Sequence, residues 1–149
     1  MKNHFLVREV AELTGLRPRE VVDACDRGII QPKEPAEGPG TRRVFSFKNL
    51  MQFGVFRLLK RFGFIRPEIK QILDEIEKSG LHEKMYSPQI EEGTLVLLME
   101  SQREGVTLKL VEIPPGGYLK FGPKQIRSSF NINMTEIKRG LVEHLRSST

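Results

Sequence analysis

The sequence has a single cysteine, Cys25, among its 149 residues. One thiol excludes an internal disulfide framework and any metal site built from several thiolates. No window approaches the ~20 apolar residues needed to span a bilayer, and the first residues contain neither an apolar signal core nor a small-residue cleavage site. The sequence therefore predicts a cytoplasmic protein without a membrane partner.

Motifs that carry enzymatic chemistry are also lacking. The sequence contains no nucleophile elbow, no Walker loop and no dinucleotide fingerprint. The histidines His4, His82 and His144 are scattered, and none has a second ligand at metal-site spacing. Cys25 falls on the inner face of an expected helix, where a thiol behaves as a small buried hydrophobe. We expect no enzyme, no cofactor and no bound metal.

Acidic residues are missing from one long stretch of the chain. Residues 38–66 contain seven Lys and Arg but no Asp or Glu, and the whole chain has a net charge of +5. Five of these seven are arginines, whose guanidinium group binds phosphate oxygens in a bidentate way. Such a block projects a positive field, which favours a polyanionic partner such as nucleic acid.

The first thirty residues predict two short helices joined by a tight turn. Small apolar residues at helical spacing predict the first helix within residues 7–14, and Gly15 suits its left-handed end. Pro18 fits the first turn of the second helix, and Gly28 is expected to end it. This pattern is typical of a helix-turn-helix.

Residues 31–43 predict a loop because they are rich in proline and glycine. A short strand directly after this loop would make it a hairpin-like wing. Ser46 is the expected N-cap of a third helix that continues to Gly63, and Pro67 opens a fourth helix. Four helices and a wing are sufficient to enclose one small core.

The apolar period changes from helical to extended after residues 81–93, which predict a loop-like linker. The apolar runs 95–99 and 106–113 predict an antiparallel hairpin with its turn at 101–105, and Asn133 is the expected cap of a terminal helix. The expected fold class is α+β, mainly α. The expected units are a four-helix winged domain at 1–80, the linker at 81–93, and a hairpin-plus-helix module for dimerisation or effector response at 94–149.

Five fragments follow one another in a specific order and spacing: VREVAELTGL at 7–16, DRGIIQP at 26–32, RVFS at 43–46, KRFGF at 60–64 and EIKQIL at 68–73. Together they resemble the winged helix-turn-helix domain of the MerR family of bacterial transcription regulators, over residues 5–77. The resemblance implies a DNA-binding regulator with its recognition helix, 18–27, in the major groove and a basic wing, 38–45, on the DNA backbone. Double-stranded DNA and RNA polymerase are the partners that the resemblance implies.

The residues expected to contact DNA lie on three segments of this domain. Arginines in the wing are expected to bind phosphates, which supplies affinity rather than sequence reading. By resemblance, Phe45 occupies a position where the family usually has a tyrosine. The expected contacts are Arg17, Arg19, Glu20, Asp23 and Arg27 on the recognition helix, Arg42, Arg43 and Phe45 in the wing, and Lys48, Arg57 and Lys60 on the third helix.

The recognition helix departs from the family pattern. Val22, Asp23 and Ala24 stand where members commonly carry an arginine followed by two aromatic residues, and Asp23 would repel a phosphate unless it accepts from a cytosine amino group. Two alternatives therefore stay open. One is an excisionase-like or nucleoid-associated protein that bends DNA. The other is a protein-interaction adaptor that has kept the winged fold and lost DNA binding.

The long dimerisation helix of typical family members is blocked here by Gly80, Pro88 and Gly93. Twofold DNA sites still favour a homodimer. We therefore expect a different dimer interface, built from residues 94–146, in which hairpin edges and the apolar stripe of the terminal helix supply the surface. The candidate contacts are Leu97, Leu108, Leu141 and Leu145.

Overall fold

The computed structural model of the chain describes residues 2–38, 41–102, 105–117 and 126–147. These residues form six helices and one three-stranded antiparallel sheet, which confirms the predicted α+β class. The elements are α1 Val7–Thr14, α2 Pro18–Asp26, α3 Phe47–Arg61, α4 Arg66–Lys78, α5 His82–Tyr86, β1 Thr94–Gln102, β2 Gly105–Ile113, β3 Ile126–Asn133 and α6 Met134–Ser147.

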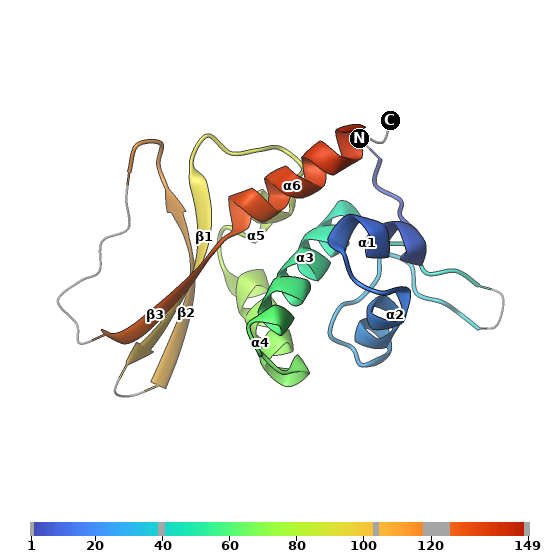
Figure 1. Cartoon of the computed structure of the whole chain (residues 1–149), viewed down its shortest axis with the longest axis horizontal. Helices are drawn as coiled ribbons and strands as arrows, with labels where there is room; N and C mark the ends of the chain where they lie inside the picture. The colour runs from blue at the N-terminus through green and yellow to red at the C-terminus, as the bar shows by residue number, and fades with distance from the viewer. Residues whose placement is uncertain (1, 39–40, 103–104, 118–125, 148–149) are drawn as a thin grey trace.

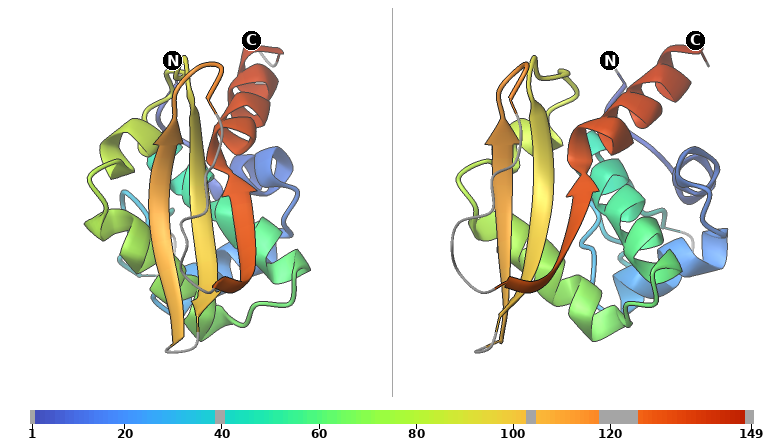
Figure 2. Two further views of the ribbon diagram at one scale, coloured as in Figure 1. Left: turned by 90° about the vertical axis from the view of Figure 1, so that its left-hand side faces the viewer. Right: turned by 60° about the vertical axis from the view of Figure 1, so that its left-hand side comes forward.

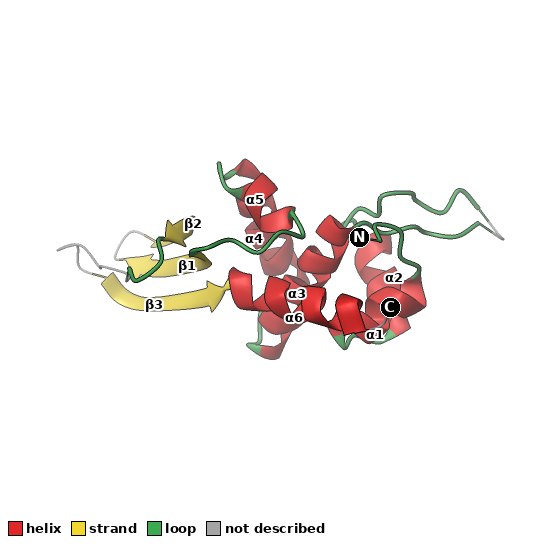
Figure 3. Ribbon diagram, turned by 90° about the horizontal axis from the view of Figure 1, so that it is seen from above, coloured by secondary structure: helices red, strands yellow, loops and turns green. Residues whose placement is uncertain are grey.

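The helices form one body, and the sheet lies at one end of it (Figure 1). In that view α3 and α4 lie between the sheet and the pair α1 and α2, and the described parts of the 31–43 loop, residues 31–38 and 41–43, project from the opposite end. Seen from above, α6 continues from β3 along the helical body towards α1 (Figure 3). Because α6 contacts α1, α3 and β1, it connects the sheet to the N-terminal helices.

The helix boundaries follow from the residues predicted to set them. Gly15 ends α1 with a φ of 76°, in the left-handed region that glycine adopts without a Cβ clash. Ser46 caps α3, because its hydroxyl accepts from the backbone N–H of Asn49 at 3.2 Å. The side chain of Asn133 accepts from the backbone N–H of Glu136 at 3.0 Å and caps α6 in the same way. These three boundary predictions are confirmed.

The sheet has the strand order β2-β1-β3. The pairing of β1 with β2, in which Thr94 lies opposite Ile113 and Met99 opposite Leu108, confirms the predicted hairpin; residues 103 and 104 of its expected turn lie outside the described residues. The third strand, β3, pairs with the other side of β1 (Figure 2), and the predicted hairpin-plus-helix module lacked it. Ser128 interrupts the alternation of Ile126, Phe130 and Ile132 with polar residues, so only a short alternating run remained and the strand was not predicted.

The expectation of a loop throughout residues 81–93 is wrong for five of them. His82–Tyr86 form α5, and its Met85 and Tyr86 are 0% and 8% exposed. Both side chains belong to the same hydrophobic cluster as α3 and α4. A helix of little more than one turn is too short to show an apolar period, so its burial against α3 and α4 could not be read from the sequence.

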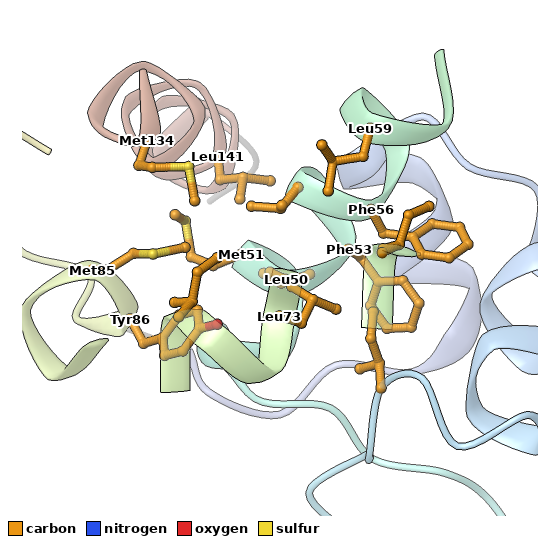
Figure 4. Close-up of a cluster of buried hydrophobic side chains, with 14 of the residues drawn as sticks. Leu50, Met51, Phe53, Phe56, Leu59, Leu73, Met85, Tyr86, Met134 and Leu141 are labelled. Atoms are coloured by element: carbon orange, nitrogen blue, oxygen red, sulfur yellow. The ribbon is translucent and has the colours of Figure 1, made fainter. Parts of the chain in front are cut away.

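Buried side chains from both halves of the chain form one hydrophobic cluster. Figure 4 shows Met134 and Leu141 of α6 beside Leu50 and Met51 of α3, with Met85 of α5 next to them. Full burial of such a side chain stabilises the fold by about 1.5–3 kcal/mol. The core of the N-terminal helices is therefore completed by α6, which lies at the far end of the sequence.

A charged cluster is enclosed where α6 meets the segment before β1. The Lys138 ammonium donates to the backbone oxygens of Lys84 at 2.8 Å and Gln89 at 3.0 Å, and to the carboxylate of Glu91. The side chains of Lys138 and Glu91 are 0% and 2% exposed. Burial lowers the pKa of Lys138, while the Glu91 carboxylate opposes that shift.

Two of the four expected dimer contacts need correction. Leu97 and Leu141 are 1% and 4% exposed, and both belong to the core of the single chain. Leu141 lies on the side of α6 that contacts α3, and Leu97 of β1 is part of the same core cluster, so neither can reach a second copy without leaving that core. Leu108 and Leu145 are partly buried and keep part of their surface accessible.

Candidate nucleic-acid interface

The turn between α1 and α2 holds the two helices against α3. Val21 and Ala24 are fully buried on the inner side of α2. A Cβ at Gly15 would lie 2.8 Å from the Arg57 Cζ atom, so the Arg57 guanidinium rests directly over the turn. The opposite side of α2 is left accessible, and it carries the charged side chains of this helix.

Ion pairs join the outer side of α2 to three other segments. Glu20 lies 2.8 Å from Lys60 at the end of α3, and Asp23 lies 2.9 Å from Arg66 at the start of α4. Asp26 lies 2.5 Å from Arg43, the last residue of the 31–43 loop. The expected contacts Glu20, Asp23, Arg43 and Lys60 are therefore brought together around one helix.

Cationic partners favour the charged form of two acidic side chains of α2, Glu20 and Asp23. A hydrogen bond from Lys60 lowers the pKa of Glu20, and a hydrogen bond from Arg27 lowers the pKa of Asp23. The carboxylates of Glu20 and Asp23 therefore stay ionised to a lower pH than they would without these cations. Asp23 also pairs with Arg27 one turn along α2, at 3.0 Å, so each acid of the helix binds at least one cation.

The predicted wing is held by two isolated bridges rather than by a regular strand. Val44 and Glu34 exchange backbone hydrogen bonds of 2.9 and 3.0 Å, and Phe45 and Phe5 exchange bonds of 2.8 and 2.9 Å. These bridges fix the return of the loop against the N-terminal segment. Residues 39 and 40, at the tip of the predicted wing, lie outside the described residues, whereas Arg42 is described and exposed.

Phe45 is not available to a nucleic acid, and this expectation is wrong. Its side chain is 0% exposed, and its ring meets that of Phe53 edge-on at 5.7 Å between centroids. Its backbone bridge to Phe5 turns the side chain into the core. The partner that fixes this orientation comes from the N-terminus, so the local sequence around the loop did not reveal it.

The remaining expected contacts are divided between two places. Arg17, Arg19 and Arg27 are exposed on or beside α2. Lys48 lies elsewhere: its ammonium is 2.6 Å from Glu77 of α4 and 5.3 Å from the ring centroid of Tyr86. The structure thus separates Lys48 from the cations around α2.

Arg57 also faces a different surface from Lys60. It borders a shallow groove of about 240 Å³ between α1, α3 and α6, together with Arg61, Gly54 and Ile137. Its position over Gly15 supports the α1–α2 turn. The structure therefore gives Arg57 a packing role in addition to its exposed charge.

Two residues of this surface were not among the expected contacts. Arg66 and Asp26 complete the ion pairs around α2. Arg66 belongs to the acid-free stretch 38–66, so its charge was a signal that could have included it. The pairing of Asp26 with Arg43 depends on the path of the loop between them, which composition does not predict.

The described residues offer no arrangement for a metal site, a membrane span or a reactive thiol. In this part of the chain no three His, Cys, Asp or Glu side chains gather to hold a metal ion, and no helix is both long and apolar enough to cross a bilayer. Burial raises the pKa of the Cys25 thiol to about 11, which disfavours the thiolate that nucleophilic or metal-binding chemistry requires.

Comparison with known proteins identified no relative of this chain. No protein-family model matches the chain, and a search of curated proteins finds no significant match.

Proposed function

We propose that this chain is a DNA-binding transcription regulator with a winged helix-turn-helix of the MerR type. In this proposal α1 and α2 form the helix-turn-helix, α2 enters the major groove, and the 31–43 loop is the wing that lies on the DNA backbone. The resemblance of residues 5–77 to that family is one support. The other is the geometry of the cations around α2.

One observation carries the proposal: three segments distant in sequence from α2 place cations around the outer side of this single short helix. Lys60 and Arg66 approach α2 from the α3–α4 side, and Arg43 approaches from the loop. Together with Arg19 of α2 and with Arg17 and Arg27 at its two ends, these cations outnumber Glu20, Asp23 and Asp26. Arginine and lysine that converge on an exposed helix match the pattern of phosphate contacts which flank a recognition helix.

The three acids of α2 favour a second candidate, the protein-interaction adaptor. Their ion pairs neutralise part of the positive field at short range, which weakens attraction to a polyanion. A protein partner would tolerate such a mixed surface, whereas DNA would displace the acids from their partners. Salt-dependent DNA binding separates the two candidates.

The test is fluorescence anisotropy with a pool of random-sequence duplexes and with duplexes selected from that pool, over a series of salt concentrations. A regulator is expected to prefer the selected duplexes by a factor of roughly 10³ or more. Arg42→Ala is expected to weaken binding to all duplexes about equally and to reduce the salt slope by about one unit. Lys78→Ala, at the far end of α4, is the matched control.

Absence of binding to every duplex at low salt would refute the proposal and favour the adaptor. Binding with little preference for the selected duplexes would favour the DNA-bending, nucleoid-associated alternative. The homodimer and the contact with RNA polymerase that the resemblance implies remain proposals, and the first is tested by sedimentation.

A further inference from the structure

A groove lies between α1, α3 and α6, where α6 packs on the N-terminal helices. Its volume is about 240 Å³, and Leu13 of α1, Gly54 of α3 and Gly140 of α6 contribute to its lining. In Figure 1 α6 lies along the helical body next to α3 and reaches towards α1, in agreement with its contacts to both helices. We call it the three-helix groove. A cavity of roughly 150 Å³ holds a benzene ring, so this groove has room for a ligand of one ring with a short substituent.

The glycine in the middle of α6 keeps this groove open. Gly140 lies inside a helix, where glycine is the least favourable residue apart from proline. No heavy atom of the described structure lies within 4 Å of a Cβ built at this position, so packing within the chain does not require the absence of a side chain. A residue that is unfavourable for its helix and not needed for packing indicates a role outside the fold.

The walls of the three-helix groove are apolar. Leu13 of α1 and Ile137 of α6 line it and are half-buried, and Leu141 of α6 lines it from the core. Small-molecule sites are typically apolar in this way, with a few polar groups that fix the orientation of the ligand. The walls therefore favour a ligand with an apolar body, because its contact with them removes apolar surface from water.

Two arginines of α3 line the same groove. Arg57 and Arg61 are four residues apart, so their side chains lie on one face of the helix. The ion pairs of α3 are made by Lys48 and Lys60, whereas neither of these two arginines pairs with an acid in the described part of the chain. Both are exposed. Guanidinium groups without a counter-charge favour an anionic ligand, and they bind a carboxylate in a bidentate way.

The acidic residue that lines the groove does not neutralise these arginines. Glu136 of α6 forms an ion pair with Arg139 one turn further along its own helix. Its charge is therefore already balanced, and the positive charge of α3 dominates the groove.

We propose that the three-helix groove binds a small organic acid whose apolar part lies between α3 and α6 and whose carboxylate binds Arg57 and Arg61. Charge complementarity selects the anionic end of this ligand, and the apolar walls select its body. A phosphate of DNA would use the two arginines but would leave the walls and the space over Gly140 unoccupied. The observations therefore favour an organic carboxylate over a simple phosphate contact.

The groove is shallow, so a ligand of this size is expected to bind with a dissociation constant on the order of 0.1–1 mM. The inference goes beyond the proposed function and does not depend on it, because the groove faces a different surface from the ion pairs around α2. A ligand held there contacts all three helices at once, including the first helix of the proposed helix-turn-helix.

The test is an NMR titration of the full, isotopically labelled chain with cinnamate, an aryl carboxylate. Saturable shifts are expected in the backbone amide signals of Gly54 and Gly140, which lie in the groove. Cinnamamide has the same shape without the charge, and inorganic phosphate has the charge without the apolar body. Each is expected to bind at least about tenfold more weakly than cinnamate, because each lacks one of the two interactions.

Two variants test the two halves of the site. Arg61→Gln removes one guanidinium and is expected to weaken cinnamate about fivefold or more while it leaves the weak binding of cinnamamide unchanged. Gly140→Leu places a side chain in the open space of the groove and is expected to weaken cinnamate at least about tenfold. Arg8→Gln removes the same charge from an exposed position of α1 outside the groove and should bind like the parent. Thermal unfolding confirms that each variant is folded.

Four outcomes would overturn the inference. The first is the absence of saturable shifts with cinnamate up to about 10 mM, since the expected affinity is higher. The second is equal binding of cinnamate and cinnamamide, which would mean that the arginines do not bind the carboxylate. The third is equal binding of cinnamate and inorganic phosphate, which would identify a simple anion site such as a DNA backbone contact. The fourth is unchanged binding by folded Gly140→Leu, which would place the ligand elsewhere. Because no DNA is present in this titration, its result is independent of the test of the proposed function.

Discussion

Lys138 of α6 and Glu91 of the segment before β1 form an ion pair that is almost completely withdrawn from solvent. The Thr135 hydroxyl extends this cluster, since it accepts from the Leu95 backbone N–H at 2.8 Å and donates to Glu91 at 3.2 Å. Three parts of the chain therefore depend on one buried charge pair: α6, the segment after α5, and the first residues of β1.

Glu91→Gln is predicted to destabilise the fold by about 3–5 kcal/mol, because it leaves the Lys138 ammonium buried without a counter-charge. The lost stability should return partly as pH rises. Burial lowers the pKa of Lys138 below its value in the unfolded chain, so above the folded pKa the folded state binds fewer protons than the unfolded state, and the free energy of unfolding increases with pH. Urea unfolding between neutral and alkaline pH measures both effects.

Glu92→Gln is the matched control for that measurement, since Glu92 is exposed beside the cluster. It is expected to change stability by less than about 0.5 kcal/mol. Equal stability of the Glu91→Gln and Glu92→Gln variants would show that the buried pair contributes nothing to the fold.

Gly54→Ala is predicted to weaken the packing of α6 on α3. A Cβ at this position would lie 2.8 Å from the Cγ2 atom of Ile137, and that β-branched side chain cannot turn away without leaving its preferred rotamer. The clash costs about 1–3 kcal/mol, which outweighs the helix propensity that alanine adds, about 1 kcal/mol. Thermal unfolding is expected to show a lower Tm than that of the parent.

Gly140→Ala, on α6, is expected to have the opposite effect on stability. No heavy atom lies within 4 Å of a Cβ built at Gly140, so only the gain in helix propensity applies and the Tm should rise slightly. Gly54→Ala should become neutral or stabilising once Ile137 is replaced by alanine. If Gly54→Ala is as stable as Gly140→Ala in the parent chain, the close approach of the two helices is not as described.

Asp23→Asn is predicted to tighten DNA binding severalfold at low salt. The change releases Arg27 and Arg66 from their shared carboxylate, and the additional positive charge should steepen the salt slope by about one unit. Glu112→Gln removes one negative charge from β2, where Glu112 pairs with Lys84, and it should leave binding unchanged. Weaker binding by Asp23→Asn would instead indicate that Asp23 contacts a base.

Cys25 is predicted to react with iodoacetamide about a hundredfold more slowly than an unperturbed thiol at pH 8, because only the thiolate reacts. Burial raises its pKa to about 11, so the rate should keep rising with pH until that value is reached. The same chain unfolded in urea serves as the control and should react at the ordinary rate. A fast reaction of the folded chain would mean that α2 opens readily.

The homodimer is predicted to form through the accessible surface of the sheet and of α6 rather than through the buried Leu97 and Leu141. Leu108→Lys with Leu145→Lys places charges on the two partly buried leucines and is expected to yield monomers in sedimentation experiments at micromolar concentration. Thr107→Lys, at an exposed position of the same strand, is the control and should sediment like the parent. A parent chain that is monomeric under these conditions would rule out the dimer.

The sequence predicted most helices because their boundaries are set locally. Gly15, Ser46 and Asn133 act within three or four residues of themselves, and apolar spacing between such signals identifies a helix. The short helix α5 and the strand β3 were missed, since five residues show no period and the residues of β3 are largely polar. Their structure depends on distant partners, α3 and α4 in one case and β1 in the other.

The sequence predicted the positive charge of the candidate interface but not which of its residues form ion pairs with one another. The acid-free stretch 38–66 identified the basic residues that surround α2. That Glu20 and Asp26 would hold Lys60 and Arg43 depends on how the chain folds back between them. Phe45 was misplaced for the same reason, because its burial follows from a backbone bridge to Phe5.

Strand β3 ends at Asn133 and α6 begins at Met134, with no loop residue between them. The Asn133 side chain closes this junction by its bond to Glu136. The strand and the helix therefore behave as one rod whose two halves engage different parts of the molecule, β1 on one side and α1 and α3 on the other. Because no loop separates the two elements, any tilt of the sheet relative to the helices has to be accommodated by α6 and by its contacts with α1 and α3.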